Sequence, residues 1–501
     1  TMSYISGKTS LDYTYDKGNL TSVKRGGYKP GNTNKLSEEY TFTYNDYGQT
    51  VTSSVAGRTL MTNTYDEYDR LARSDYGNGS AYTYEYDIFD RVTCRRALDT
   101  GEIERYTYDY RSNIWRVDCS KANEDGSETA GLTYIYDYDS IGRLLRVTET
   151  DGNTVKREVG YGYDSKNRLS SIAYYDGLTV RTESAEYNDN GTVSKYTMAG
   201  GDTAVSGYDG LNRTTSKIYS TAGTTSGAYK HIVNYTYKAG AGTNQATELI
   251  SQMRYNIPAG DNRTYGYTYD NQGNITEVTE QVGDDPDSAE TVGRYMYDDM
   301  GQLVLEEVYP IGEEAYTMVY EYDTYGNIRS EKKYHSVGFS SVSQAYAFGT
   351  LKGTVPYYYA DVSGTSADGT SWRDQLQSRG GRMMSYDSIG NPIGYYNGTQ
   401  YTFAWENGRQ LKSVDEVTVN PVTETTTTEH ILDFEYDRDG VRTNKYVSGV
   451  ANYTYKMENG RLVTMLRDDE NGQRQFRFSY DDTGRPYGFT YSIRGSSGAS
   501  Q

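Results

Sequence analysis

Nucleophilic catalysis would require a serine or cysteine beside a histidine that can accept its proton. The 501 residues contain only three histidines, His231, His335 and His430, and none lies in a recognisable catalytic motif. No Gly-x-Ser-x-Gly turn is present either. The sequence therefore does not predict a hydrolase built on an activated nucleophile.

Two short motifs could suggest a bound ligand. Residues 7–9 (Gly-Lys-Thr) resemble the end of a phosphate-binding loop, but Met2 stands where that loop has its first glycine. Residues 137–139 (Asp-Tyr-Asp) could hold calcium weakly, but no complete series of ligands with a distal glutamate accompanies them. Turn formation explains these aspartates better. We expect no catalytic residue, no cofactor and no metal site.

The two cysteines are expected to be free thiols. Cys94 lies two residues after Val92, on the same face of its strand. Cys119 lies five residues after Ile114, on the opposite face. In equivalent strands the two thiols would point to opposite sides of a sheet and could not form a disulfide. Two cysteines fit an oxidising or a reducing compartment equally well.

The composition favours a β protein and disfavours two kinds of partner. A net charge of −19 opposes nucleic acid, whose binding needs clustered Lys and Arg, and no apolar stretch is long enough to span a membrane. Tyrosine supplies 57 residues and phenylalanine only 9, so tyrosine must provide most of the buried surface. Strand faces allow each ring to pack while its hydroxyl reaches a partner. Abundant glycine, 53 residues, supplies tight turns.

A repeated unit close to Tyr-x-Tyr-Asp-x-x-Gly-Arg-Leu runs through the chain at an irregular period. Its clearest copies span residues 136–144, 161–169, 267–275, 295–303 and 320–328. Seventeen copies carry an anchor aromatic residue: Tyr15, Tyr44, Tyr65, Tyr86, Tyr108, Tyr138, Tyr163, Tyr187, Tyr208, Tyr269, Tyr297, Tyr322, Tyr386, Trp405, Tyr436, Tyr455 and Tyr480. Such self-similarity indicates a repeat array rather than several unrelated domains.

The spacing within the unit predicts a hairpin turn after each anchor. Four residues after the anchor, sixteen copies carry Gly, Asn, Asp or Ser, and only Arg409 departs. Glycine and asparagine tolerate the positive φ that closes a bulged hairpin, and the aspartate can accept a backbone N–H two residues on. An aliphatic pair spaced by three residues after the turn indicates a β-bulge. The predicted structural turn residues are Asp139, Gly142, Asp270, Gly273, Asp298, Gly301, Asp323, Gly326, Asp387 and Gly390.

The fold predicted from these units is all-β, with tandem hairpins forming one long coiled sheet. Two strands per copy give about 34 strands, and at ~4.8 Å spacing a flat ribbon of that number would be roughly 160 Å long. Accumulated strand twist should coil such a ribbon into a curved wall. The motif lapses in residues 336–385, so we divide the array into residues 1–335, an irregular insertion over 336–385, and a continuation over 386–501.

These copies resemble the YD-repeat family, which includes bacterial RHS proteins, the cocoon of insecticidal toxin complexes and the animal teneurins. Within this family the chain most resembles RHS proteins of Gram-positive bacteria, through residues 371–374, 385–392 and 405–411. The resemblance implies a sheet that spirals into a hollow shell, open or partial here. The family's core-terminal segment, with its self-cleaving Asp-Pro motifs, is not matched, because the only Asp-Pro is Asp285-Pro286 within an acidic loop.

The resemblance implies a non-enzymatic shell segment that encloses or supports a C-terminal toxin or effector polypeptide of the same full-length protein. It also implies a secreted or cell-surface location. The alternative is a cell-surface adhesion module, because exposed tyrosines on a curved sheet could bind carbohydrate or a surface protein.

Overall fold

The computed structural model describes residues 2–6, 9–28, 35–175, 179–223, 229–242, 245–258, 260–323, 325–335, 337–360, 372–420 and 423–494. A phosphate-binding loop was considered at residues 7–9 together with Met2. Residues 7 and 8 lie outside these ranges, and Met2 and Thr9 lie in strands at positions whose side chains are not described. The described chain forms 39 strands, one short α-helix and one 3-10 turn.

The first 28 strands form what we call the outer coil. They are β1 (Met2–Ser6), β2 (Thr9–Asp16), β3 (Asn19–Tyr28), β4 (Lys35–Tyr44), β5 (Thr50–Val55), β6 (Arg58–Tyr65), β7 (Leu71–Tyr76), β8 (Ala81–Tyr86), β9 (Val92–Ala97), β10 (Glu102–Tyr108), β11 (Ile114–Ala122), β12 (Glu128–Tyr138), β13 (Leu144–Asp151), β14 (Thr154–Tyr163), β15 (Leu169–Tyr175), β16 (Val180–Tyr187), β17 (Val193–Thr197), β18 (Thr203–Tyr208), β19 (Thr214–Ser220), β20 (His231–Ala239), β21 (Ala246–Asn256), β22 (Arg263–Tyr269), β23 (Ile275–Val282), β24 (Glu290–Tyr297), β25 (Leu303–Val308), β26 (Tyr316–Tyr322), β27 (Ile328–Tyr334) and β28 (Leu351–Tyr359). The 3-10 turn η1 (Pro286–Ser288) precedes β24, and helix α1 (Val342–Phe348) precedes β28.

The last 11 strands form what we call the inner arm. They are β29 (Leu376–Arg379), β30 (Arg382–Tyr386), β31 (Pro392–Tyr396), β32 (Gln400–Glu406), β33 (Gln410–Val419), β34 (Thr426–Tyr436), β35 (Arg442–Val447), β36 (Ala451–Glu458), β37 (Arg461–Asp469), β38 (Gly472–Tyr480) and β39 (Pro486–Arg494).

Every strand pairs antiparallel with the strand that follows it in the chain. Within the described residues β1 pairs only with β2 and β39 only with β38, so the sheet stays open. The prediction of an almost helix-free array of hairpins that stack in sequence order is confirmed.

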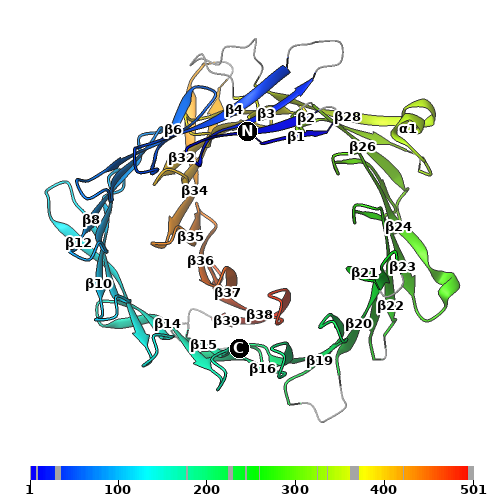
Figure 1. The fold of residues 1–501 in the computed structure, drawn as a ribbon, viewed down its shortest axis with the longest axis horizontal. Coiled ribbons are helices and arrows are strands. Elements are labelled where there is room, and N and C mark those ends of the chain that lie inside the picture. The colour runs from blue at the N-terminus through cyan, green and yellow to red at the C-terminus, as the bar shows by residue number, and fades with distance from the viewer. Residues whose placement is uncertain are drawn as a thin grey trace.

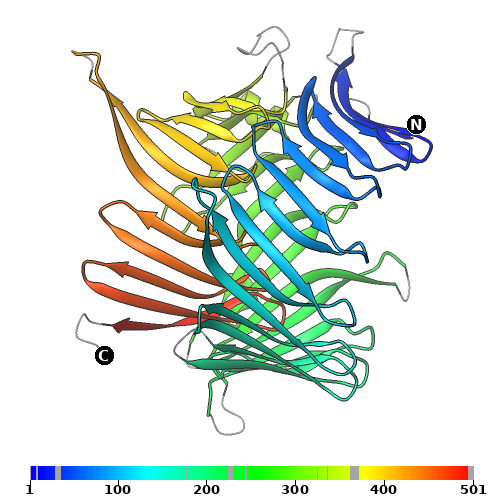
Figure 2. The same cartoon turned by 90° about the vertical axis from the view of Figure 1, so that its left-hand side faces the viewer.

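The ribbon coils into a spiral. Figure 1 shows the outer coil as a nearly complete ring, with β32 to β39 of the inner arm running inside it. Figure 2 shows that the inner arm is also displaced along the axis of that ring. Twist that accumulates over many hairpins explains this curvature. The inner arm therefore lies beside strands that are hundreds of residues away in sequence.

A β-bulge follows the repeat turn, as the spacing of the aliphatic residues predicted. Tyr138 pairs with Leu144 and Asp137 pairs with Arg146, which leaves Leu145 without a partner in the ladder. The same shift of register occurs at the other repeat turns, for example beside Tyr163. Each bulge adds local twist, so the repeat itself supplies part of the curvature.

Two of the three clusters of buried side chains lie where the inner arm meets the outer coil. Val463 of the inner arm packs with Val159, Ile172 and Tyr174 of the outer coil. A second cluster around Met198 and Tyr219 is covered by Tyr487 of the arm, and a third lies under α1 around Leu305. A single sheet has no second layer of its own, so contacts with the inner arm and with α1 provide these clusters.

Residues 336–385 contain α1, β28, β29 and most of β30. These strands continue the pairing between the outer coil and the inner arm without a break. We propose that this stretch is an insertion within one array, with repeats on either side over residues 1–335 and 386–501.

Candidate functional site: the seam between the coils

The turn after each anchor residue, which we call the YD turn, is held by its own aspartate. Asp139 Oδ1 accepts the backbone N–H groups of Ile141 and Arg143, each at 2.9 Å. Asp270, Asp298, Asp323 and Asp387 accept N–H groups two and four residues on in the same way. The carboxylate thus satisfies backbone donors that the tight turn leaves outside the ladder.

The glycine of the YD turn lies in the left-handed region. The φ angles are 90° at Gly142, 89° at Gly273, 73° at Gly301, 82° at Gly326 and 90° at Gly390. Two copies depart from the predicted spacing, because Lys17-Gly18 and Asn407-Gly408 carry the positive φ angles one or two residues earlier. The turn after Tyr15 is a two-residue loop with both φ positive, so Asn19, four places after the anchor, is the first residue of the next strand. After Tyr455, Asn459 has the predicted positive φ and Gly460 a second one, but the ladder shifts register beside Met457 rather than beside Tyr455.

In most repeats the anchor side chain ties the repeat to the one before it. Tyr86 Oη donates to the carbonyl oxygen of Leu71, the first residue after the preceding YD turn, at 2.8 Å. Equivalent hydrogen bonds are made by Tyr44, Tyr65, Tyr108, Tyr138, Tyr163, Tyr187, Tyr208, Tyr237, Tyr269, Tyr322, Tyr386, Tyr436 and Tyr480. Trp405 makes the same bond with its indole N–H, at 2.6 Å to the carbonyl oxygen of Pro392. An aromatic donor is therefore needed at this position, which explains why tyrosine rather than phenylalanine dominates the sequence.

Arginines reinforce the YD turns of the outer coil. Arg70 pairs with Asp66 of its own turn at 2.8 Å and lies 4.7 Å above the ring of Tyr86, the next anchor. It also reaches Asp90 of the next turn at 3.0 Å. The same stacking joins Arg91 to Tyr108, Arg143 to Tyr163, Arg168 to Tyr187 and Arg213 to Tyr237. These turns form a braced rim, and many of their tips face solvent, among them Tyr47, Tyr68, Phe89, Ile141 and Leu211.

The YD turns of the inner arm instead dock on the wall of the outer coil, and we call this interface the seam. At its first contact Ser388 Oγ donates to the carbonyl oxygen of Gly77 at 2.6 Å. Asn78 Nδ2 donates to the carbonyl oxygen of Gly408 at 2.9 Å. Ile389, at the tip of the turn, is completely buried. The turn therefore acts as a plug in the wall of the outer coil.

Three charged contacts follow along the seam. Arg157 of β14 pairs with the buried Glu458, whose carboxylate also accepts the Tyr161 hydroxyl at 2.7 Å. The next contact has the opposite polarity, because Arg461 of the arm donates to the buried Glu183 of β16 at 2.8 Å. Charged groups this far from water need such partners.

The third charged contact holds the last YD turn of the arm. Lys217 of β19, only 4% exposed, reaches Asp482 Oδ1 at 2.5 Å and Asp481 Oδ2 at 3.7 Å. Tyr219 Oη donates to Asp481 at 3.3 Å, and its ring stacks on Tyr487 with the centroids 5.2 Å apart. The His231 ring also stacks on Tyr219, with the centroids 4.5 Å apart, and burial lowers the pKa of His231.

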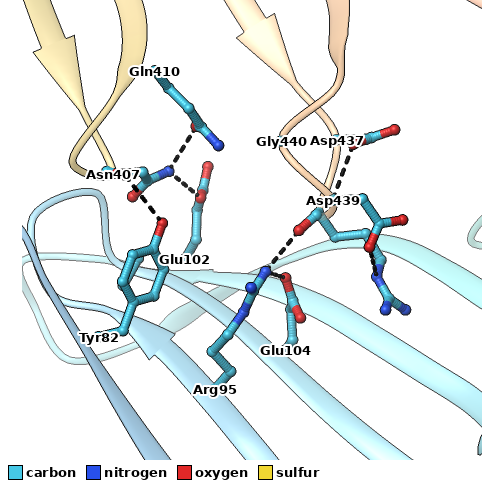
Figure 3. A pocket seen from close by; sticks show the side chains of 11 residues that line it. Tyr82, Arg95, Glu102, Glu104, Asn407, Gln410, Asp437, Asp439 and Gly440 are labelled. Atoms are coloured by element: carbon cyan, nitrogen blue, oxygen red, sulfur yellow. Dashed lines mark hydrogen bonds and ion pairs between the residues drawn. The ribbon is translucent and has the colours of Figure 1, made fainter. Parts of the chain in front are cut away.

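A polar cavity of about 290 Å³ lies in the seam between the Asn407 turn and the turn over 437–440 (Figure 3). Several of its side chains pair with one another: Arg95 pairs with Glu104, and Asn407 Nδ2 donates to Glu102 at 2.9 Å. Burial raises the pKa of Asp437, whereas the backbone N–H of Arg168 lowers the pKa of the equivalent Asp164 in the outer coil. We find here a packed joint rather than a catalytic constellation.

The residues that could have carried chemistry lie apart. His231 is in the seam, while His430 lies on the exposed β33–β34 hairpin between Asp415 and Asp433, each at 2.6 Å. Hydrogen bonds from these two carboxylates raise the pKa of His430. Among the described residues no group of three or more His, Cys, Asp or Glu is placed to hold a metal ion. Cys94 and Cys119 are free thiols, and their partners on β10 are adjacent residues that point to opposite faces.

Comparison with known proteins agrees with this architecture. Residues 138–180 match the family model of the RHS repeat. The structure is similar to a chain in the Photorhabdus luminescens Tc holotoxin pore carrying the mutation TccC3-D651A, with a TM-score of 0.52 and 13% identity over 98% of this chain and 26% of that one. The match to the RHS repeat covers residues 138–180, and the likeness to the Tc holotoxin chain is one of fold.

A second solved structure is less similar to this chain. The structure described as TcdB2-TccC3-TEV gives a TM-score of 0.44 at 12% identity, over 98% of this chain and 29% of that one. The chain thus spans between a quarter and a third of the length of these solved chains. No curated protein matches it in sequence. Within the described residues, no helix is both long and apolar enough to cross a membrane.

Sequence reasoning missed two features of this structure. Tyr237 is an anchor, as its hydrogen bond to Thr214 and its stacking under Arg213 show, but a longer loop replaces its Asp-x-x-Gly turn. Residues 372–374, within the stretch that lacks repeats, dock on β4: the backbone N–H of Arg373 donates to the buried Glu38 at 2.8 Å. The run Ser-Trp-Arg-Asp was a signal for family resemblance, but its contact could not be inferred from it.

Proposed function

We propose that this chain is a non-enzymatic shell segment that encloses or supports a C-terminal toxin or effector polypeptide of the same full-length protein. The observation that carries the proposal is the seam, because it holds the inner arm against the outer coil and so keeps the coiled ribbon closed as a wall (Figure 1). A ribbon held only by its strand ladder could flex or unroll, whereas buried ion pairs and plugged turns fix its curvature.

The way in which the charged groups of the seam are used also supports a structural role. Its charged groups are committed to one another across the two layers, as Arg157 is to Glu458 and Lys217 to Asp482. The Tc holotoxin pore structure shares the fold of this chain, and the chain covers 26% of the length of the matching chain there. The enclosed polypeptide would belong to another part of the protein, and a secreted or cell-surface location is proposed with it.

The proposal is tested by expressing the chain and the full-length gene product side by side in a susceptible cell. We expect the chain alone to be harmless, with any toxicity residing in the C-terminal segment. Killing by residues 1–501 alone would contradict a purely structural role.

Limited proteolysis of the full-length product tests enclosure directly. Lys217→Glu would face Asp481 and Asp482 and should open the seam, so the C-terminal segment should be digested faster than in the wild type. The matched control is Lys166→Glu, whose pair with Asp189 is exposed on the rim. Equal protection of the segment in both variants, with the seam shown to be open, would contradict enclosure.

A further inference from the structure

The charges along the seam alternate in sign. On the inner arm, Glu458, Arg461 and Asp482 follow one another as negative, positive and negative. On the wall of the outer coil, the three partners Arg157, Glu183 and Lys217 are positive, negative and positive. They lie on β14, β16 and β19, so the contacts are two and three strands apart. The two rows are complementary in only one alignment.

Stability alone does not account for these pairs. Removing two charges from water costs several kcal/mol per ion, so a buried ion pair is often no more stabilising than an apolar contact of the same size. The carboxylates of Glu183 and Glu458 are nevertheless buried, and each is held by a second donor, Tyr174 and Tyr161 respectively. Buried polar groups of this kind are best known for fixing register between packed elements.

The seam contacts that end on backbone carbonyl oxygens cannot fix register. Asn78 binds the carbonyl oxygen of Gly408, and Arg181 binds the carbonyl oxygen of Val463 at 2.8 Å. Every hairpin offers carbonyl oxygens, so an arm displaced by one hairpin would find similar acceptors. A device that distinguishes one hairpin from the next must use side chains that differ between them.

We propose that the three ion pairs are a register code that sets where the inner arm docks along the outer coil. On the arm, Glu458 and Arg461 face each other across the β36–β37 turn, whereas their partners on the wall lie two strands apart. If the arm slipped by two strands in one direction, Glu458 would face Glu183, and a slip by three strands would bring Arg461 to Lys217. In the other direction, two strands would bring Arg461 to Arg157, and three would bring Asp482 to Glu183. Slips in both directions bury like charges together, so both are strongly disfavoured. The code thereby fixes the number of strands per turn of the spiral and hence its diameter.

Distances between two spin labels test the code in the full chain. Labels are placed at the exposed Val180 of β16 and Val450 of the arm, after Cys94 and Cys119 are replaced by serine. The wild-type pairs should give one narrow distance distribution. A slip by one contact moves the arm by two or three strands, which displaces the distance by roughly 10 to 15 Å.

Three variants separate register from stability. Neutralising all six groups (R157M, E458Q, E183Q, R461M, K217M and D482N) should broaden the distribution or split it into several distances. Reversing only the wall (R157E, E183R and K217E) should move the main distance by one contact, because the slipped alignment is then the complementary one. Exchanging both sides of all three pairs should restore the single wild-type distance.

Each result bears on the proposal. A narrow wild-type distance in the neutral variant, or in the variant with only the wall reversed, would overturn it. Failure of the fully exchanged variant to fold would also overturn it, because a register code depends on complementarity and not on which side carries which sign. Circular dichroism identifies a variant that has not folded. The measurement does not involve any enclosed polypeptide, so it stands apart from the test of the shell function.

Discussion

The YD turns after Tyr138 and after Tyr386 are locally alike and differ in what surrounds them. In each, the aspartate accepts the N–H of the isoleucine two residues on, at 2.9 Å for Ile141 and 3.0 Å for Ile389. In each, the glycine that follows has a φ of 90°. Yet Ile141 is 64% exposed on the rim of the outer coil, while Ile389 is 0% exposed in the seam.

The comparison separates two levels of cause. The turn is determined by its own residues, because the same hydrogen bonds form in solvent and in the seam. Burial is determined by where the spiral brings the turn. One repeat unit thus builds both the ribbon and the joint that closes it, and substitutions at matched positions can measure the two contributions separately.

The largest difference is expected for the ion pairs. Lys217→Ala leaves Asp481 and Asp482 buried without their cation, so the free energy of unfolding should fall by about 3 kcal/mol or more. Lys166→Ala removes the exposed partner of Asp189 on the rim and should cause no measurable change, because water and salt screen that pair. Urea denaturation measures both variants, and equal losses would contradict the difference between rim and seam.

A comparable loss is expected for the apolar tip of the turn. Ile389→Ala opens a cavity in the seam and should lower the free energy of unfolding by about 3 kcal/mol. Ile141→Ala, at the same position of an exposed turn, should change it by less than about 0.5 kcal/mol. Urea denaturation of both variants measures these two losses of stability. A harmless Ile389→Ala would show that the arm is not seated on the wall.

The turn glycine gives a smaller effect that is independent of the seam. Gly142 has no neighbour within 4 Å of an added Cβ, so Gly142→Val reports only the cost of positive φ, about 1 to 2 kcal/mol. Gly142→Asn should cost clearly less, because asparagine tolerates this conformation. Gly390 is a poorer probe, since its added Cβ would lie 2.7 Å from the Trp372 ring. Thermal unfolding that shows the same loss for Val and Asn would contradict the assigned turn.

The smallest effect concerns protonation of the turn aspartates. The backbone N–H of Arg168 lowers the pKa of Asp164, so its stabilising contribution is present above the ordinary pKa and is lost as the pH falls through the lowered one. Burial raises the pKa of Asp437, so its charged form carries a penalty that is relieved as the pH falls through the raised value. Carboxyl NMR titration should place the two on opposite sides of the ordinary value. Equal pKa values for Asp164 and Asp437 would show that solvent reaches the turn of Asp437.

The ribbon of hairpins could be predicted from the sequence, but the seam between the inner arm and the outer coil could not. Anchor residues, turn glycines and bulges are consequences of local backbone geometry, which short motifs report. Where local geometry differed, the prediction was wrong: Asn19 was counted with the turn residues, but Lys17 and Gly18 supply the positive φ angles of that turn. The meeting of Arg157 with Glu458 depends on twist summed over many hairpins, and no spacing within the sequence records that sum.

Hydrogen exchange at the two isoleucines tests the central claim that the inner arm docks through its YD turns. The N–H groups of Ile141 and Ile389 have the same acceptor and nearly the same length of hydrogen bond, so any difference in exchange reports the surroundings alone. Peptides that cover each turn can be followed by mass spectrometry in the intact chain. We predict that the turn at Ile389 exchanges at least tenfold more slowly than the turn at Ile141. Equal rates would mean that the turn at Ile389 is as open to solvent as the rim, and would contradict the seam.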